Sequence, residues 1–298
     1  MTTLMDKRDV SRTERAAPRK KRGLGLRHYN YLGGLGGWLW LIVVLLPIYW
    51  IVITSFKLQS DYYATNPLVP PSNPTLENYR FVLENDFVRY FVNSVIVTVG
   101  AVGPAVLVSF MAAYAIVRGS AASRFLRGVN GLFLMGLAIP LQAVIIPIYL
   151  LIIKLQMYDT LGAIILPSLA FAIPLSVLVL GNFVRDVPKE LFESMRMDGA
   201  TEWGTLWRLA FPLTRPALVT VTIYQGLTVW NGFILPLILT QTPEQRTLPL
   251  ALWSFQGQYS VNIPAVLASV VLTTLPILTL YIIGRRQLLS GLTAGFSK

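Results

Sequence analysis

Arg185–Arg215 reads RDVPKELFESMRMDGATEWGTLWRLAFPLTR, a charged stretch between two long apolar ones. Pro188 suits the first position of a helix, and the glutamates after it lie where the positive helix end favours acidic side chains. Gly199 then ends this helix, because glycine adopts the left-handed conformation without strain. Thr201 can cap a second helix, which we expect to stop before Pro212. The stretch therefore predicts two short helices joined by a turn.

The segments on either side of this loop are long and uncharged. Of the 298 residues, 54% are hydrophobic and 13% charged, and the mean hydropathy is +0.58. A soluble domain of this size needs more surface charge, whereas a membrane core of about 30 Å needs about 20 apolar residues per helix. Six stretches qualify and lack Lys, Arg, Asp and Glu: Gly33–Phe56, Tyr90–Val117, Val129–Ile153, Thr160–Val184, Pro216–Thr240 and Ile263–Gly284. The sequence predicts an all-α integral membrane protein with six transmembrane helices.

These stretches also predict the organisation of the chain. The first is longer than the apolar region of a signal peptide, about 7–15 residues, so we expect a retained N-terminal anchor helix. The predicted parts are a basic tail (1–32), the anchor (33–56), an external loop (57–89), a five-helix core (90–284) and a C-terminal tail (285–298). Within the core, residues 185–215 form an internal loop and residues 241–262 an external one.

The distribution of basic residues predicts the orientation. Of the 25 Lys and Arg residues, 20 lie in the two tails and in the loops on the same side of the membrane. Because Lys and Arg accumulate on the cytoplasmic side, both termini are predicted to be cytoplasmic. Nine of them lie in residues 1–32, where they favour contact with anionic membrane lipid. No basic stripe interleaved with aromatic residues runs through the folded part, so the net charge of +11 does not indicate nucleic-acid binding.

Missing residue types exclude several functions. A transporter driven by protons or sodium usually carries an ionisable group at membrane depth, and the six stretches have none. The chain has no G-x-x-x-x-G-K-[ST] loop, so we expect no ATP hydrolysis by the chain itself. Its single histidine, His28, and its lack of cysteine leave no catalytic triad or metal cluster. A pore-forming or coupling subunit powered by a partner remains.

The loop from Arg185 to Arg215 resembles the EAA motif of ATP-binding-cassette (ABC) importer permeases, E-A-A-x-x-(D)-G followed nine residues later by I-x-L-P. Two alanines of the motif are replaced, and Leu and Phe stand for its Ile and Leu. The matching positions are Glu193, Ser194, Met195, Asp198, Gly199, Ala200, Leu209 and Pro212. Without this spacing, the better interpretation of the loop would be an amphipathic elbow that rests on lipid headgroups.

The resemblance implies a helix–turn–helix coupling loop that docks in a cleft on an ATPase. It implies a bacterial inner-membrane protein that binds no cofactor itself, since ATP and magnesium belong to the ATPase. The implied partners are a second permease subunit, an ATP-binding-cassette ATPase dimer and an extracytoplasmic solute-binding protein. In this family the external loop 241–262 often touches the binding protein, and the C-terminal tail approaches the ATPase.

Further local matches resemble carbohydrate-uptake permeases, on the shorter, maltose-permease-like side of the heterodimer. They include Asn73–Tyr79, Asn93-Ser94, Pro140–Pro147, Trp230–Phe233 and Gly291–Gly295. The resemblance implies a sugar, a di- or oligosaccharide, as the substrate. Two alternatives stay open. One is a solute such as glycerol-3-phosphate, although an anion is expected to need a basic group in its path. The other is an ion-coupled secondary transporter that works alone.

An uncharged path lined by amides, hydroxyls and aromatic rings suits the chemistry of a sugar. Tyr224, Thr228 and Asn231 share one helical face at spacings of four and seven residues, near the middle of the fifth stretch. Gln142, between Pro140 and Pro147 in the third stretch, is a candidate to face them. The alternative is that these residues form interhelical hydrogen bonds and interfacial aromatic belts.

Overall fold

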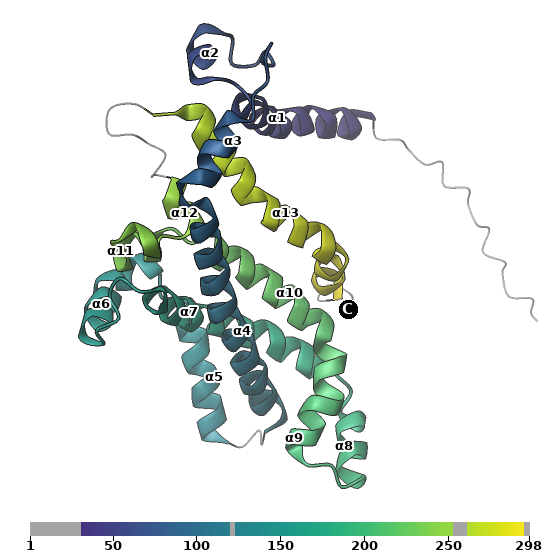
Figure 1. Ribbon diagram of the computed structural model, residues 1–298. Coiled ribbons are helices and arrows are strands. Elements are labelled where there is room, and N and C mark those ends of the chain that lie inside the picture. The colour runs from purple at the N-terminus through teal and green to yellow at the C-terminus, as the bar shows by residue number, and fades with distance from the viewer. Residues whose placement is uncertain (1–30, 120–122, 253–260, 295–298) are drawn as a thin grey trace, which may run out of the picture. The chain divides into compact units, whose positions relative to one another are not determined.

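The computed structural model describes residues 31–119, 123–252 and 261–294, and every element in these ranges is helical (Figure 1). Two units are distinguished, residues 1–46 and 47–298. Predictions about His28 and residues 1–30 lie outside the described residues, as does the end of the C-terminal tail.

The first long helix, α1 (Tyr31–Ser55), begins in the first unit and ends in the second. The other helices belong to the second unit: α2 (Gln59–Ala64), α3 (Glu77–Val82), α4 (Val88–Arg118), α5 (Arg124–Leu137), α6 (Leu141–Lys154), α7 (Leu161–Asp186), α8 (Lys189–Met197), α9 (Glu202–Thr205), α10 (Phe211–Trp230), α11 (Ile234–Leu239), α12 (Leu248–Ala251) and α13 (Ile263–Ala294). Short π turns, η1 (Leu83–Phe87) and η2 (Leu206–Ala210), precede α4 and α10, and a 3₁₀ turn, η3 (Pro243–Gln245), precedes α12.

Three helical segments of the described residues are long and apolar enough to cross a membrane: 33–55, 77–118 and 161–186. The pair α5 and α6 makes a fourth if it is one span, with a bend of 106°. An integral membrane protein is therefore supported, and the count of six spans stays a prediction.

Two predicted spans are broken in the structure. The stretch Val129–Ile153 divides at Pro140, which cannot donate a backbone hydrogen bond and precedes α6. The stretch Pro216–Thr240 divides at Asn231 and Gly232, a pair typical of turns. A third difference is that α13 continues to Ala294, so much of the predicted C-terminal tail 285–298 is helical.

The core of the second unit forms where α4 packs along α7 and where α10 packs against α4, α7 and α13. Residues at four-residue spacing on α4 are small and buried, namely Ala101, Ala105, Ser109 and Ala113. Small side chains on one face allow two helix backbones to approach closely. The hydroxyl of Ser109 donates to the carbonyl of Ile173 on α7, at 3.4 Å. This stripe therefore fixes the α4–α7 pair against which the later helices pack.

The second helix of the loop 185–215 does not stop before Pro212, so that prediction is wrong. α9, η2 and α10 follow one another with helical backbone angles at both junctions. At the π turn, the N–H of Phe211 donates to the carbonyl of Leu206, five residues back. Pro212 then lies in the first turn of α10, where its missing N–H is tolerated. The wider π turn accommodates the extra residue and carries the helix past the proline.

Candidate functional site

The turn between α8 and α9 is closed by the backbone of Gly199. Its φ of +75° is left-handed, as the sequence predicts. The N–H of Gly199 donates to the carbonyl of Arg196 at 3.0 Å, and that of Ala200 to the carbonyl of Met195 at 2.9 Å. These two bonds form a Schellman cap. A Cβ at Gly199 would meet no atom within 4 Å, so the backbone conformation alone requires glycine there.

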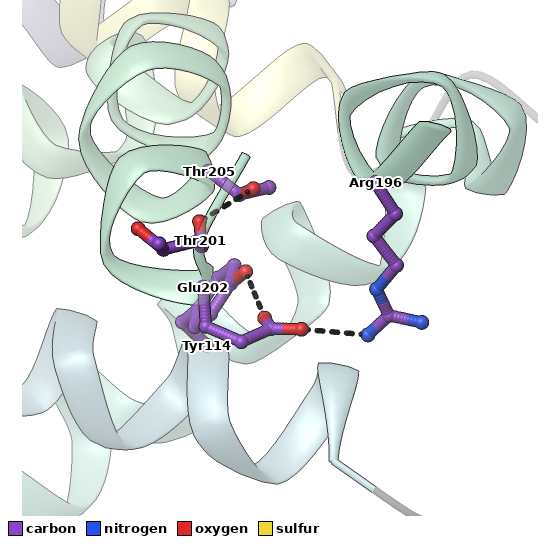
Figure 2. A network of polar contacts seen from close by, with 5 residues as sticks. All are labelled: Tyr114, Arg196, Thr201, Glu202 and Thr205. Atoms are coloured by element: carbon purple, nitrogen blue, oxygen red, sulfur yellow. Dashed lines mark hydrogen bonds and ion pairs between the residues drawn. The ribbon is translucent and has the colours of Figure 1, made fainter. Parts of the chain in front are cut away.

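The helix after the turn is capped and then tied to α4. The side chain of Thr201 accepts from the N–H of Gly204 at 3.1 Å, as predicted for a cap. Figure 2 shows the carboxylate of Glu202 between two partners: it accepts from the hydroxyl of Tyr114 at 2.7 Å and pairs with Arg196 at 2.8 Å. The hydrogen bond from Tyr114, with help from Arg196, lowers the pKa of the Glu202 carboxyl below its usual value. One carboxylate thus joins α4, α8 and α9.

An aromatic contact holds α8 at the end of α4. Phe192 on α8 is 1% exposed, and the guanidinium of Arg118 lies 3.9 Å from the centre of its ring. The ring of Tyr114 lies 6.4 Å from the same ring. A cation over an aromatic face and two packed rings are both favourable. The loop is therefore anchored on α4 by Phe192 as well as by Glu202.

The residues that match the EAA motif divide into exposed and partly buried sets. Glu193, Ser194, Asp198 and Gly199 are exposed around the turn, and Met195 and Ala200 are partly buried. Leu209, partly buried, and Pro212, exposed, lie after α9, on the helix that enters the core.

Two apolar residues beside the turn are far more exposed than their type suggests. Met197 is 89% exposed and Trp203 is 60% exposed. Exposed apolar side chains on a polar loop are typical of a surface that binds a partner. Sequence reasoning missed both residues. The available signal was their position on either side of Gly199, within a polar turn.

A cavity of about 240 Å³ lies where α10 breaks before α11. This break is at the opposite end of α10 from α8 and α9 (Figure 1). The cavity is lined from α4, α6, α7, α10 and α11, by Gly232 and Phe233 between α10 and α11, and by Thr247, which precedes α12. Its polar side chains are Ser94, Ser168, Gln225, Thr228, Trp230 and Thr247. None of the described residues that line it is charged. The cavity can therefore hold a neutral polar group.

The four predicted pathway residues are not gathered in this cavity. Thr228 lines it, whereas Tyr224, Asn231 and Gln142 are not among its lining residues. Tyr224 is 53% exposed on α10, and Gln142 is exposed in the first turn of α6, beyond the α5–α6 bend.

Asn231, predicted near the middle of the fifth span, is the C-cap residue of α10. Its amide donates to the carbonyl of Leu227 at 2.8 Å, which closes the end of its own helix.

Sequence reasoning missed Gln225, which is 4% exposed and lines the cavity. Its amide donates to the carbonyl of Ala172 at 3.0 Å and to the hydroxyl of Ser176 at 3.2 Å, both on α7. The signal was a lone amide in an apolar stretch, but the sequence gives no means of ranking it above Asn231. In the described part of the chain, no cluster of His, Asp or Glu side chains could hold a metal ion.

Curated proteins of similar length match most of the chain. A putative ABC transporter permease of Caldicellulosiruptor sp. (strain Rt8B.4) is 39% identical over 87% of this chain and 94% of its own. The diacetylchitobiose uptake system permease DasC of Streptomyces coelicolor is 34% identical over 86% of this chain and 93% of its own. The arabinooligosaccharide transport system permease AraQ of Halalkalibacterium halodurans is 32% identical over 85% of this chain and 91% of its own.

A solved structure shares the fold. It is a bacterial ABC transporter involved in the import of the acidic polysaccharide alginate, and one of its chains matches with a TM-score of 0.76 at 21% identity. The match covers 86% of this chain and 95% of that one. The family of binding-protein-dependent transport system inner membrane components matches residues 90–288. The resemblance carried by the loop 185–215 is thus confirmed, and the chain belongs to this family, the membrane permeases of ABC importers.

Proposed function

We propose that this permease forms half of the path for an uncharged sugar, a di- or oligosaccharide, and that residues 185–215 are its coupling loop. Diacetylchitobiose and arabinooligosaccharides appear in the names of two relatives, which supports the sugar class. The absence of charge among the described residues of the cavity also favours a neutral solute over glycerol-3-phosphate. An ion-coupled transporter that works alone is disfavoured by the family.

The joined construction of the loop is the observation that carries the coupling role. Glu202 and Phe192 fix the loop on α4, and η2 joins it to α10 without a break. A rigid element transmits a displacement, whereas a flexible one absorbs it. The exposed Met197 and Trp203 offer apolar anchors for the ATPase. ATP and magnesium then bind in the ATPase dimer, not in this chain.

The assembly that we propose includes a second permease, the ATPase dimer and an extracytoplasmic binding protein that contacts the loop 241–262. Both termini lie in the cytoplasm, the anchor 33–56 precedes the five-helix core, and the count of spans is six. Single cysteines test this orientation without background, because the chain has none. Ser72→Cys is expected to react with an impermeant maleimide in intact cells, and Ser194→Cys only after permeabilisation. Labelling of Ser194→Cys in intact cells contradicts the orientation.

Gly199→Val tests coupling. A β-branched residue in the left-handed region costs about 1–2 kcal/mol and displaces the turn. The complex purified with its partner subunits is expected to lose sugar-stimulated ATP hydrolysis while its subunit stoichiometry stays normal. Gly131→Val on α5 is the control, since a Cβ there meets no atom within 4 Å. Normal stimulation in Gly199→Val rules out the coupling role.

The sugar class is tested with a panel of diacetylchitobiose, trehalose, arabinotriose and glycerol-3-phosphate. We expect a neutral sugar to stimulate ATP hydrolysis in the reconstituted complex with its binding protein. Stimulation by glycerol-3-phosphate alone would replace the sugar assignment. Uptake that follows an ion gradient and persists after ATP depletion contradicts the importer mechanism.

A further inference from the structure

The cavity at the break between α10 and α11 contains polar groups that the fold does not use. The amide nitrogen of Gln225 donates both of its hydrogen bonds to Ala172 and Ser176 on α7. Its carbonyl oxygen Oε1 has no hydrogen-bond partner among the described residues, although the side chain is 4% exposed and lines the cavity. An amide oxygen without a protein partner accepts a hydrogen bond from whatever fills the space beside it.

A second polar group lines the cavity from α7. Ser168 is 9% exposed, and its hydroxyl has no hydrogen-bond partner in the ranges that the structure describes. Ser168 precedes Ala172, the residue that Gln225 contacts, by four positions, so both lie on the same face of α7. Ser168 can donate and accept, whereas Gln225 Oε1 only accepts. Together they match a group that carries hydroxyls.

Two further residues of the cavity wall carry unpaired polar atoms. Trp230 Nε1 and Thr247 Oγ1 are buried without a hydrogen-bond partner in the described residues. Both atoms are inaccessible to water in this conformation, so a ligand reaches them only after a side chain rotates. These two atoms are therefore not counted among the groups that hold a ligand in this conformation.

The rest of the wall defines the class of ligand. Phe171, Phe233 and the indole of Trp230 provide aromatic surface, and no charged residue is among the described lining. A mostly apolar wall with a few polar groups is typical of small-molecule sites, whose volumes are about 300–1,000 Å³ for drug-sized ligands. At about 240 Å³, this cavity is large enough for one sugar ring but not for an oligosaccharide. Irregular backbone such as Gly232 and Phe233 occurs at membrane depth where it lines such a cavity.

We propose that this cavity binds one uncharged sugar ring of the transported substrate, held by Gln225 Oε1 and Ser168 Oγ. This subunit then has a substrate site of its own in addition to sharing a pathway with the second permease. The inference rests on the proposed sugar class. It places the binding groups where α10 faces α7, whereas the sequence analysis expected them on the face of α10 with Tyr224 and Asn231.

A cysteine at Ser168 tests the site directly, because no other cysteine in the chain reacts. The complete complex is reconstituted in lipid nanodiscs, and the labelling rate of Ser168→Cys with a small methanethiosulfonate reagent is measured with each sugar of the panel. The sugar that stimulates ATP hydrolysis is expected to slow labelling about fivefold or more. Thr222→Cys, which lines a different groove, is the control and is expected to label at the same rate with and without sugar. Equal rates at Ser168→Cys with a stimulating sugar present overturn the site.

A pair of substitutions separates binding from packing. Ser168→Leu fills the cavity and is expected to reduce uptake per assembled complex about tenfold. Ser176→Ala removes the 3.2 Å hydrogen bond from Gln225 Nε2 to the Ser176 hydroxyl but leaves the cavity open. Uptake per complex is therefore expected to stay within about twofold. If Ser168→Leu takes up sugar normally, and the sugar still stimulates ATP hydrolysis, the cavity does not bind the transported sugar and the proposed site is wrong. If no sugar stimulates hydrolysis in the unmodified complex, the sugar class itself is wrong.

Discussion

The two ends of α10 are built in opposite ways. At its first residues, α10 continues from α9 through η2, although Pro212 lies in the way. At its last residues, α10 stops at Trp230 and α11 begins at Ile234, although the sequence there contains no proline and no charge. We expected a stop at the first end and continuity at the second. Both expectations were wrong, and in opposite directions.

The difference teaches that a proline is tolerated where the hydrogen-bond pattern has already been altered. The π turn before Pro212 places the bond from Phe211 on Leu206. An Asn-Gly pair, in contrast, ends a helix because the Asn side chain caps the last carbonyls and Gly adapts to the turn. The end of α10 at Phe211, which continues from α9 through η2, is the joined end and suits transmission of movement. The end at Trp230 is the broken end and provides irregular backbone beside the cavity.

Arg208→Pro breaks the joined end. Its side chain is exposed in η2, whereas proline there removes a backbone donor and clashes with the preceding turn, at a cost of about 3 kcal/mol. Sugar-stimulated ATP hydrolysis is expected to fall by roughly tenfold or more relative to basal hydrolysis. Arg208→Ala, which keeps the backbone donor, is the control. Equal stimulation in the two variants means that continuity between α9 and α10 is not needed.

Asn231→Leu alters the broken end. If the exposed amide also bonds sugar hydroxyls in passage, its loss costs about 1–3 kcal/mol, or roughly tenfold or more in uptake. Complex yield and the affinity of the binding protein are expected to stay level, since the amide bonds only its own helix. Poor assembly instead indicates a structural role at the end of α10. Full uptake in a well-assembled complex removes Asn231 from the pathway.

Glu202→Gln loosens the attachment of the joined end to α4. The carboxylate is exposed and an amide keeps part of its bonding, so we expect stimulated hydrolysis to fall only about two- to fivefold. Because the folded pKa of Glu202 is lowered, the attachment is complete above the ordinary value of 4.5 and is lost as pH falls through the lower value.

A double variant with Tyr114→Phe is expected to lose little more than Tyr114→Phe alone, since Tyr114→Phe removes the 2.7 Å hydrogen bond that Glu202→Gln weakens. Additive losses contradict a shared joint between α4 and the loop.

The parts of the fold that depend on local chemistry could be predicted from the sequence. Gly199 and Thr201 act through bonds within five residues, so their roles as caps were visible. Glu202 acts through Tyr114, which is 88 residues away, and Gln225 acts through Ala172, 53 residues away. A single sequence does not report such pairs.

The long apolar helices were predictable from composition. Their breaks lie at local signals, Pro140 and the Asn231-Gly232 pair, but the sequence does not rank these above Pro104 and Pro167, which lie inside unbroken helices.

The π turn at Leu206–Ala210 has a geometric consequence for the orientation of α8 and α9 relative to α10. A π turn contains one residue more than an α turn, and each residue of an α-helix rotates the chain by about 100°. Deleting one residue here would restore regular α geometry and turn α8 and α9 by about that angle around the axis of α10. The extra residue therefore sets the angular phase between the docking face and the cavity face. Two surfaces at opposite ends of one helix are thus aligned by the number of residues in one turn.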